Sequence, residues 1–265
     1  MFWKPEDAGR STALIDGDYF IYLAASAVER ATDWGGGLWT LHALEGEGQQ
    51  VLQDTLTDLQ ERAGAERLVL GLSDTARTFR YDLWPAYKAN RAGKRRPMIL
   101  GCLIRYAEDA YETVRLKGLE GDDTLGVLAT APHAPRSCIL VSCDKDIRTV
   151  PGRHLDLKSD EIVTVSEDAA DYLHCIQTLG GDPVDGYAGV PGVGPKTAAK
   201  LLQNAWCDGT LDRAEAWGAI LKAFEKAGMS AGEALLQARL ARILRSGEYN
   251  YEDGSVSLWK APEVG

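Results

Sequence analysis

Four short apolar stretches of the sequence are each followed by acidic residues. The stretches cover residues 13–15, 68–70, 113–116 and 139–141, and the acids after them are Asp16 with Asp18, Asp74, Glu120 with Asp122 and Asp123, and Asp144 with Asp146. Helical patterns, such as those of residues 22–31 and 49–64, separate the apolar stretches. This alternation predicts an α/β domain with a largely parallel sheet flanked by helices. In such a sheet the carboxyl ends of the strands open onto one edge, so we expect the acids to converge there.

The convergence of so many acids needs a physical reason. Any one of these aspartates, taken alone, is more simply explained as a turn or helix-cap residue. Two like charges about 5 Å apart repel each other by roughly 3 kcal/mol at an effective dielectric constant near 20. The side chains must therefore either spread into water or surround metal ions. Because four predicted strands repeat the pattern, we favour a metal site.

The cysteines and histidines do not suggest a zinc site. The chain has five cysteines without a C-x-x-C spacing, and an odd number argues against a disulfide framework. Its four histidines are scattered, with no H-x-x-x-H pair. A set of carboxylates alone suits hard divalent cations, first Mg²⁺ and then Mn²⁺ as a substitute.

Length and charge set wider limits. A chain of 265 residues with 45% hydrophobic and 26% charged residues is typical of a globular protein with one large domain or two coupled ones. No apolar run approaches the length of a membrane span, and the first ten residues lack the apolar core of a signal peptide, so we expect a cytoplasmic protein. The net charge of −10 argues against nucleic-acid binding. That argument fails if the acids are local and bind metal.

The second part of the chain has a helical pattern. Residues 166–180 begin with Ser166 as an N-cap, residues 212–228 form another candidate helix, and Ser230 with Glu233 has the spacing of a capping box. We expect the arginines at 239, 242 and 245 to be solvated, and residues 248–259 to form a small β-hairpin. The predicted division is an α/β catalytic core at 1–165 and a helical region at 166–265.

A glycine-rich motif lies at the start of this helical region. The segment "GDPVDGYAGVPGVGPKTAAKLL" begins at Gly181 and contains two more acids, Asp182 and Asp185. Its glycines, lysine and threonine form a helix-hairpin-helix signature that offers backbone N–H groups to phosphate, and the residues concerned are Gly189, Gly192, Gly194, Lys196 and Thr197. The simpler alternative is a tight connection between two helices. Backbone contacts of this kind recognise DNA structure and not base sequence.

A basic segment, "FRYDLWPAYKANRAGKRRP", precedes the third acidic group. Its cations are Arg80, Lys88, Arg91, Lys94, Arg95 and Arg96, and they alternate with the aromatic residues Tyr81, Trp84 and Tyr87. A solvated surface loop would have the same composition. Cations beside aromatic rings also suit phosphate contacts and base stacking, and this segment is the main basic region of an acidic chain.

Together these motifs resemble the flap endonuclease, or 5′-nuclease, superfamily, and within it the 5′-to-3′ exonucleases of T7-like bacteriophages. The resemblance extends over nearly the whole chain and rests on "DGD" at 16–18, "YKANR" at 87–91, "LEGDD" at 119–123, "SCDKD" at 142–146, the "GD" and "DGY" of 181–187, and "ARIL" with "EYN" near the C-terminus. It implies a PIN-like sheet with a helix-hairpin-helix subdomain. It also implies a metal-dependent 5′-to-3′ exonuclease that hydrolyses duplex DNA, at 5′ ends, nicks or flaps, to 5′-phosphorylated products. Removal of RNA from RNA–DNA hybrids during phage replication is a further implication.

The resemblance assigns roles to individual residues. The implied metal-site carboxylates, which would hold two Mg²⁺ ions, are Asp16, Asp74, Glu120, Asp122, Asp123, Asp144, Asp146, Asp182 and Asp185. Lys88 and Arg91 match the residues that contact the scissile phosphate, and Asp16 and Asp74 are counted with them as catalytic. The glycine-rich motif and the cations Lys94, Arg95 and Arg96 would bind DNA.

Two departures from the family pattern affect these expectations. The segment between Arg91 and Tyr111, where relatives build an arch over the 5′ end, is short, and the hairpin motif is closer to that of cellular 5′-nucleases than to the T7 version. The preference between exonuclease and flap endonuclease activity is therefore open. A PIN-like ribonuclease, which would not need the hairpin motif, and a DNA-binding scaffold, which would not need the acids, are the alternatives.

Overall fold

A six-stranded sheet forms the centre of the molecule. The computed structural model describes residues 2–7 and 9–263. The strands are ordered β5 (Glu112–Arg115), β4 (Arg67–Leu72), β1 (Thr12–Asp16), β6 (Ile139–Val141), β7 (Gly152–Asp156) and β8 (Glu161–Val165). Neighbouring strands are parallel except β7 and β8, which are antiparallel. The predicted mostly parallel sheet is confirmed, and the strands that precede the acids occupy four adjacent positions in it.

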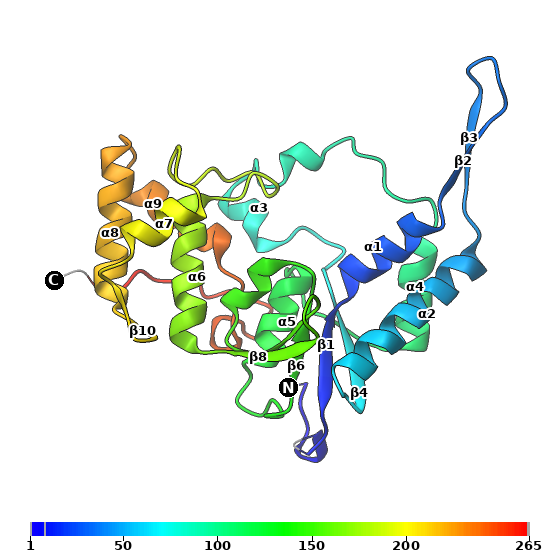
Figure 1. Ribbon diagram of the computed structural model, residues 1–265, viewed down its shortest axis with the longest axis horizontal. Helices are drawn as coiled ribbons and strands as arrows, with labels where there is room; N and C mark the ends of the chain where they lie inside the picture. The colour runs from blue at the N-terminus through cyan, green and yellow to red at the C-terminus, as the bar shows by residue number, and fades with distance from the viewer. Residues whose placement is uncertain (1, 8, 264–265) are drawn as a thin grey trace.

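Helices cover both faces of the sheet because successive side chains of its central strands point to opposite faces. Ile15, Leu70 and Val141 pack against α1 (Gly17–Ala27), α2 (Glu45–Arg62) and α4 (Leu100–Ala110). The neighbouring residues of the same strands, such as Leu14, pack against α5 (Gly121–Ala129) on the other face. Figure 1 shows α1, α2 and α4 grouped on one side and α5 on the other. The short helix α3 (Phe79–Leu83) follows β4.

The chain after β8 forms a second group of helices. They are α6 (Glu167–Gly180), α7 (Pro195–Leu201), α8 (Arg213–Lys226) and α9 (Ala231–Ala241), with a two-stranded sheet of β9 (Trp206–Cys207) and β10 (Thr210–Leu211). The predicted caps are confirmed: the Ser166 hydroxyl accepts a hydrogen bond from the Ala169 N–H at 3.1 Å, and Ser230 with Glu233 forms a capping box. This group has its own hydrophobic core, built around Leu202, Trp217 and Phe224.

The last residues return to the α/β part. Ile243 packs in the core beneath α5, and Leu244 packs against Leu119. The expected C-terminal hairpin is reduced to one antiparallel bridge between Tyr249 and Val256, without named strands on either side. These residues follow residue 165 and yet pack in the core of the α/β part. The division of the chain at residue 165 therefore stays a prediction.

The expectation of solvated arginines near the end of α9 is wrong for two of them. The helix ends at Ala241, so the residues after it turn inward. Arg242 is buried and contacts Glu248 at 3.0 Å, while Arg245 contacts Asp171 at 2.6 Å. Both arginines therefore belong to an internal network of ion pairs. The third, Arg239, donates to the Trp259 carbonyl at 3.2 Å.

Two histidines are core residues. His154 and His174 are buried, and each has a ring nitrogen within 2.9 Å of a backbone carbonyl oxygen. Burial, which disfavours the charged ring, lowers the pKa of His154 to about 4 and that of His174 to about 3. Neither lies among the predicted acids, which agrees with a packing role.

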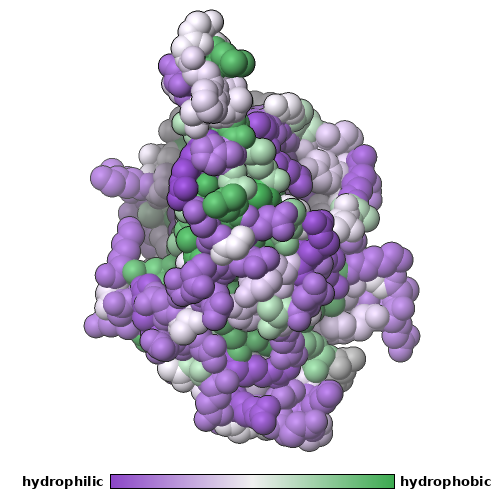
Figure 2. All heavy atoms as spheres, turned by 90° about the vertical axis from the view of Figure 1, so that its right-hand side faces the viewer, coloured by the Kyte–Doolittle hydropathy of each residue, from purple (hydrophilic) through white to green (hydrophobic). Residues whose placement is uncertain are grey.

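One feature was not predicted. Strands β2 (Arg30–Asp33) and β3 (Trp39–His42) form an antiparallel hairpin between α1 and α2. The hairpin extends away from the rest of the molecule (Figures 1 and 2). Among the described residues, no helix is both long enough and apolar enough to cross a membrane.

Candidate active site at the carboxyl edge of the sheet

The first acids are fixed where β1 passes into α1. Asp16 is the last residue of the strand and the N-cap of the helix, and its Oδ1 accepts a hydrogen bond from the Tyr19 N–H at 3.1 Å. Its Oδ2 accepts one from the Ser142 hydroxyl at 2.8 Å, which ties β1 to the loop after β6. Asp18 Oδ2 accepts from the Ser73 N–H at 2.8 Å and the Ser73 hydroxyl at 2.5 Å, after β4.

The hydroxyl group of Ser73 holds this corner together. The Ser73 hydroxyl oxygen also accepts a hydrogen bond from the Gly121 N–H at 2.9 Å, at the start of α5. A Cβ atom on Gly121 would lie 2.8 Å from Asp18 Oδ2. Glycine at this position leaves room for the Asp18 carboxylate, and Ser73 links three segments at the edge.

The "LEGDD" acids divide into different environments. Glu120 is the N-cap of α5. Its two carboxylate oxygens accept hydrogen bonds from Lys88 Nζ at 2.6 Å, the Tyr87 hydroxyl at 2.8 Å and Arg80 Nη1 at 3.1 Å. Burial raises the pKa of Glu120, but the charges of Arg80 and Lys88 outweigh burial and hold it below the ordinary value. Asp122 differs, because its Oδ1 atom is buried and accepts no hydrogen bond from the described residues.

Asp123 is not placed as a metal ligand. Its side chain is completely buried and accepts two hydrogen bonds from Arg80, of 2.5 and 2.9 Å. It also accepts from the Leu244 N–H at 3.1 Å. Arg80 in turn donates to the carbonyl oxygens of Leu240 and Arg242. We therefore assign Asp123 to the joint between α3, α5 and the end of α9, and correct its predicted role.

The side chain of Asp74 is bound by backbone N–H groups of nearby turns. Its Oδ2 accepts a hydrogen bond from the Gly118 N–H at 2.7 Å, and its Oδ1 accepts one from the Ala76 N–H at 3.2 Å. The bonds to Gly118 and Ala76 lower the pKa of this carboxyl group. Here the simpler explanation of a turn residue accounts for the contacts, so Asp74 is also outside the ligand set proposed below.

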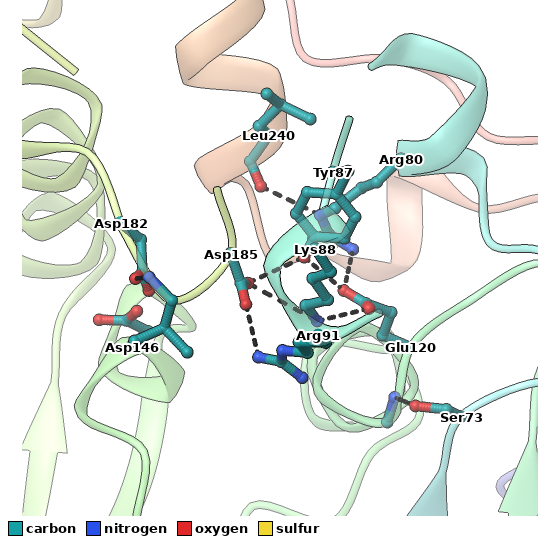
Figure 3. A network of polar contacts seen from close by, with 12 residues as sticks. Ser73, Arg80, Tyr87, Lys88, Arg91, Glu120, Asp146, Asp182, Asp185 and Leu240 are labelled. Atoms are coloured by element: carbon teal, nitrogen blue, oxygen red, sulfur yellow. Dashed lines mark hydrogen bonds and ion pairs between the residues drawn. The ribbon is translucent and has the colours of Figure 1, made fainter. Parts of the chain in front are cut away.

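The last four acids come from the loop after β6 and the loop after α6. Asp144 caps a 3-10 helix by accepting from the Asp146 N–H at 2.9 Å, and Asp146 accepts from Gln177 Nε2 at 2.6 Å. Asp182 closes a turn through two backbone hydrogen bonds with Tyr187, and its side chain accepts from the Val184 N–H at 2.7 Å. In Figure 3, Asp146 and Asp182 lie together, with Asp185 between them and Glu120.

Basic side chains enter this acidic edge from residues 87–91. Lys88 Nζ lies 2.6 Å from Glu120 and 3.6 Å from Asp185, and Arg91 Nη2 lies 2.7 Å from Asp185. The Tyr87 hydroxyl oxygen lies 2.9 Å from Asp185 Oδ2, so it also connects the two carboxylates (Figure 3). Lys88 has a left-handed backbone with φ of +53°, and its N–H donates to the Asp185 carbonyl.

The mutual proximity of the acids appears in their pKa values. Burial, together with the charges of Asp18 and Asp144, raises the pKa of Asp16 to about 6. Burial also raises the pKa of Asp122 well above its ordinary value, with Asp16, Asp144 and Glu120 adding to the shift. For Asp146 burial and the charges of Asp144, Asp182 and Asp185 raise the pKa to about 7. The acids after β1, β5, β6 and α6 thus repel one another at one place.

The donor set fits divalent cations, although it is not preassembled. In residues 2–7 and 9–263, no group of three or more His, Cys, Asp or Glu side chains is arranged to hold one metal ion. Lys88 and Arg91 instead compensate part of the negative charge. The buried, unpartnered Oδ1 of Asp122 and the carboxylates with raised pKa values are nevertheless unfavourable without a cation. Oxygen donors alone suit Mg²⁺ or Mn²⁺.

The glycine-rich motif forms an exposed turn before α7. Gly192, Gly194, Lys196 and Thr197 are exposed, as a surface for phosphate requires. Gly189 is different: it is buried, and its N–H donates to Gln237 Oε1 at 2.9 Å. A Cβ atom there would lie 2.3 Å from the Gly181 nitrogen, so the position needs glycine for packing. We correct its predicted DNA contact to a structural role.

The basic segment at 94–96 is exposed but not entirely free. Arg95 forms an ion pair of 2.5 Å with Glu29, just after α1, and is therefore less available for the predicted DNA contact, while Lys94 and Arg96 are exposed. Between Arg91 and α4 the structure describes an irregular chain and not a helical arch. Its two ends are held by Asp185 and Glu29, respectively.

Comparison with known proteins decides the family. The model for the N-terminal resolvase-like domain of 5′-3′ exonucleases matches residues 11–172, more than half of the chain. An exodeoxyribonuclease of Enterobacteria phage T3 is 32% identical, over 93% of this chain and 91% of its own. The chain belongs to the 5′-3′ exonuclease family. The exonuclease of Escherichia phage T7 is also 32% identical, over 93% of this chain and 92% of its own.

Solved structures share the fold of this exonuclease. A complex of the bacteriophage T5 flap endonuclease with DNA and metal ions is 14% identical, with a TM-score of 0.63 over 88% of this chain and 89% of that one. The T5 5′-exonuclease with bound zinc ions is 15% identical, with a TM-score of 0.65 over 88% and 89%, respectively. At these identities the likeness concerns the fold alone.

Sequence reasoning missed the hydroxyl groups that orient the acids. Ser73 and Ser142 each follow a strand of the sheet and bind Asp18 and Asp16, respectively. A serine directly after the apolar stretch was the available signal, in "LGLS" and "ILVS". Arg80 was noted only as part of a basic segment, and Tyr87 as part of that segment and of "YKANR"; neither was assigned a carboxylate partner, because their partners lie far away in the sequence.

Proposed function

We propose that this member of the 5′-3′ exonuclease family hydrolyses phosphodiester bonds of duplex DNA from 5′ ends, nicks or flaps, and releases 5′-phosphorylated products. The proposal rests on the arrangement of charged side chains at the carboxyl edge of the sheet. Acids from four separate segments lie close together there, beside the positive charges of Lys88 and Arg91, which suit a phosphate. RNA in RNA–DNA hybrids is a further proposed substrate, in a role in phage replication.

Two divalent ions, Mg²⁺ or Mn²⁺, would complete the site. The proposed ligands, direct or through water, are Asp16, Glu120, Asp122 and Asp144 for one ion, and Asp146, Asp182 and Asp185 for the other. Such ions supply a nucleophilic water at neutral pH and stabilise charge on the phosphodiester and the leaving oxygen. Occupation would relieve the repulsion that raises the pKa values of Asp16, Asp122 and Asp146.

The chain's own residues bind and orient the phosphate. Lys88 and Arg91 now contact Glu120 and Asp185, and a cation on these carboxylates would free both side chains to bind oxygens of the scissile phosphate. The exposed turn of Gly192, Gly194, Lys196 and Thr197, together with Lys94 and Arg96, would bind the DNA backbone away from the reacting bond. Because these contacts do not read bases, we expect little sequence preference.

The test of this function is a time course on duplex DNA labelled at the 5′ end of one strand and the 3′ end of the other, with Mg²⁺ or with EDTA. We expect early release of the 5′ label as mono- or dinucleotides from blunt and nicked duplexes, with Mg²⁺ only, because the cation is part of the site. Release mainly as intact flaps would shift the proposal to a structure-specific endonuclease.

Two other outcomes would contradict the proposal. Early release of the 3′ label would reverse the polarity, and cleavage that survives an excess of EDTA would remove the metal ions from the mechanism. Single-stranded RNA and RNA–DNA hybrid duplexes of the same sequence are run in parallel. Preference for single-stranded RNA would favour a PIN-like ribonuclease.

A further inference from the structure

A cavity of about 160 Å³ lies in the second group of helices, away from the acidic edge. It is bordered by α6, α8, the segment after α9 and residues 259–262. Its charged lining consists of Asp171, Arg213, Arg242, Arg245 and Lys260. Four of these described side chains are cations and one is an acid, in a chain whose net charge is −10. Cations gathered around one cavity attract anions into it.

Arg242 is the most unusual group of this cavity. Its side chain is only 7% exposed, and its Nε donates to the Glu248 carboxylate at 3.0 Å. The Nη1 atom is buried and lies 3.6 Å from Asp171 Oδ1, which is too long for a hydrogen bond. Neither Nη1 nor Nη2 donates to another described residue. Buried donors of native proteins nearly always have an acceptor, so this guanidinium group is suited to bind one from outside the chain.

The ion pairs around the cavity do not balance its charge. Asp171 accepts hydrogen bonds from Arg245 Nη2 at 2.6 Å and from Arg213 Nε at 2.8 Å. Asp168 lies 2.8 Å from Arg213 Nη1, and Glu248 is the partner of the buried guanidinium described above. Three acids therefore face the four cations of the lining.

The excess of positive charge affects Arg245 in particular. Its Nε atom is buried and has no hydrogen-bond partner among the described residues. Burial, and after it the charge of Arg242, lowers the pKa of Arg245. Water molecules in the cavity would accept hydrogen bonds from these groups but would not compensate their charge. A bound anion does both.

The size of the cavity and the directions of its donors select a phosphate group. At about 30 Å³ per water molecule, the cavity holds roughly five waters, which corresponds to an ion of five heavy atoms such as phosphate. Arg213 comes from α8, whereas Arg242 and Arg245 follow α9. Donors from separate segments suit the three terminal oxygens of a phosphate monoester, while a carboxylate offers two oxygens in one plane. A backbone phosphodiester carries substituents on two of its oxygens, so it fits such a small cavity less well.

The cavity opens beside exposed cations and has an aromatic wall. Arg213 and Lys260 are both exposed and line it. The Trp259 ring packs against those of His174 and Trp217, with centroids 5.2 and 5.4 Å apart, respectively. Burial lowers the pKa of His174 to about 3, so this ring adds no charge. A phosphate group can therefore enter past two cations, and an organic group attached to it can extend to the surface.

Helix α6 separates this cavity from the acidic edge. Asp171 lies nine residues, about 14 Å, before the end of the helix at Gly180, whereas Asp182 follows that end. Figure 1 shows α6 between α8 and the sheet. A ligand in the cavity therefore leaves the proposed metal site free.

We propose that this cavity binds the phosphate group of a small phosphate monoester, or inorganic phosphate. Arg242 and Arg245 provide the buried donors, and Arg213 and Lys260 provide the charges at the entrance. The inference goes beyond the proposed function and does not depend on it. The shared chemistry has two sources, free inorganic phosphate and the terminal phosphate of a mononucleotide.

The test is calorimetric titration of sodium phosphate into the protein in EDTA, at constant ionic strength set with chloride. We expect one site per chain with a Kd of roughly 0.1 mM, which a few charge-assisted hydrogen bonds can supply. Arg242→Lys keeps the charge but removes the forked donors, and should weaken binding at least roughly tenfold. Lys260→Ala should weaken it roughly threefold, because this charge is exposed. The exposed position also makes this variant informative if thermal unfolding shows that Arg242→Lys does not fold.

Two controls locate the bound phosphate. Arg105→Lys, on the exposed side of α4, should bind phosphate as the wild type does. Lys88→Met should bind it equally well, because Lys88 lies at the acidic edge. Absence of phosphate binding by the wild type, or an unchanged affinity in both Arg242→Lys and Lys260→Ala, would overturn the inference. Loss of binding in Lys88→Met would assign the phosphate to the acidic edge and overturn it as well.

Two further titrations distinguish the sources of the phosphate group. Thymidine 5′-monophosphate should bind at the same site, with the same response to Lys260→Ala. Tighter binding than that of inorganic phosphate would identify the mononucleotide as the ligand, and equal or weaker binding would identify inorganic phosphate. The dinucleotide dTpT without a terminal phosphate has only a diester and should not bind. Binding of dTpT as tight as that of the monophosphate would contradict the preference for a monoester.

Discussion

Asp122→Asn is expected to abolish most of the Mg²⁺-dependent cleavage while DNA binding in EDTA stays at the wild-type level. The buried Oδ1 of Asp122 accepts no hydrogen bond from the described residues, and neighbouring acids oppose its ionised form. A buried carboxylate without a hydrogen-bond partner on one oxygen, close to other acids, is suited to bind a cation. Losing one ligand that stabilises transition-state charge by about 4 kcal/mol corresponds to a roughly thousandfold slower step. The rate of single-turnover cleavage of a 5′-labelled duplex measures this loss of activity.

The same variant should not lower the free energy of unfolding in EDTA. The amide removes a charge that burial disfavours and loses no described hydrogen bond of Oδ1. Asp58→Asn, on the exposed side of α2, is the matched control and should leave cleavage unchanged. If Asp122→Asn cleaves as fast as Asp58→Asn, Asp122 is not a ligand of a required ion.

Lys88→Met is expected to slow cleavage by about 10²- to 10³-fold, the usual loss when one preorganised donor to a developing charge is removed. Lys88 Nζ contacts both Glu120 and Asp185 in the absence of metal. Methionine keeps the apolar stem and removes the charge. In EDTA the two carboxylates then lose a partner, and we expect about 2 kcal/mol of destabilisation, less than for a fully buried pair because the groups are partly exposed.

A metal titration separates the two roles of Lys88. If Lys88 competes with the cation for Glu120 and Asp185, the Mg²⁺ concentration for half-maximal rate should fall in Lys88→Met although the maximal rate falls too. Lys226→Ala, at the exposed end of α8, should change neither quantity. A normal maximal rate in Lys88→Met would mean that this lysine only balances charge in the resting protein.

The convergence of the acids was predictable, but their individual environments were not. Parallel strands must end at one edge, so the positions of Asp16, Glu120 and Asp144 in the sequence were sufficient to bring them together. Which carboxylate remains free depends on partners that are remote in sequence. Asp123 is neutralised by Arg80, 43 positions earlier, and by a backbone group 121 positions later. No local pattern contains that information.

The same limit explains the differences at other residues. Gly189 and Arg95 have the residue types that DNA binding requires, yet the first packs against Gly181 and the second binds Glu29. The hairpin of residues 30–42 has no hydrophobic alternation directed at a core, because both of its faces are exposed. Signals that follow from local chain geometry, such as the caps at Ser166 and Ser230, were read correctly.

The central claim is that the carboxyl edge of the sheet binds two divalent ions, and calorimetric titration of Mn²⁺ into the protein tests it most directly. We predict two ions per chain for the wild type. We predict one ion for the double variant Asp16→Asn with Asp122→Asn, and one for Asp146→Asn with Asp182→Asn, because each pair belongs to a different proposed ligand group. Absence of Mn²⁺ binding by the wild type, or an unchanged stoichiometry in both double variants, would contradict the account.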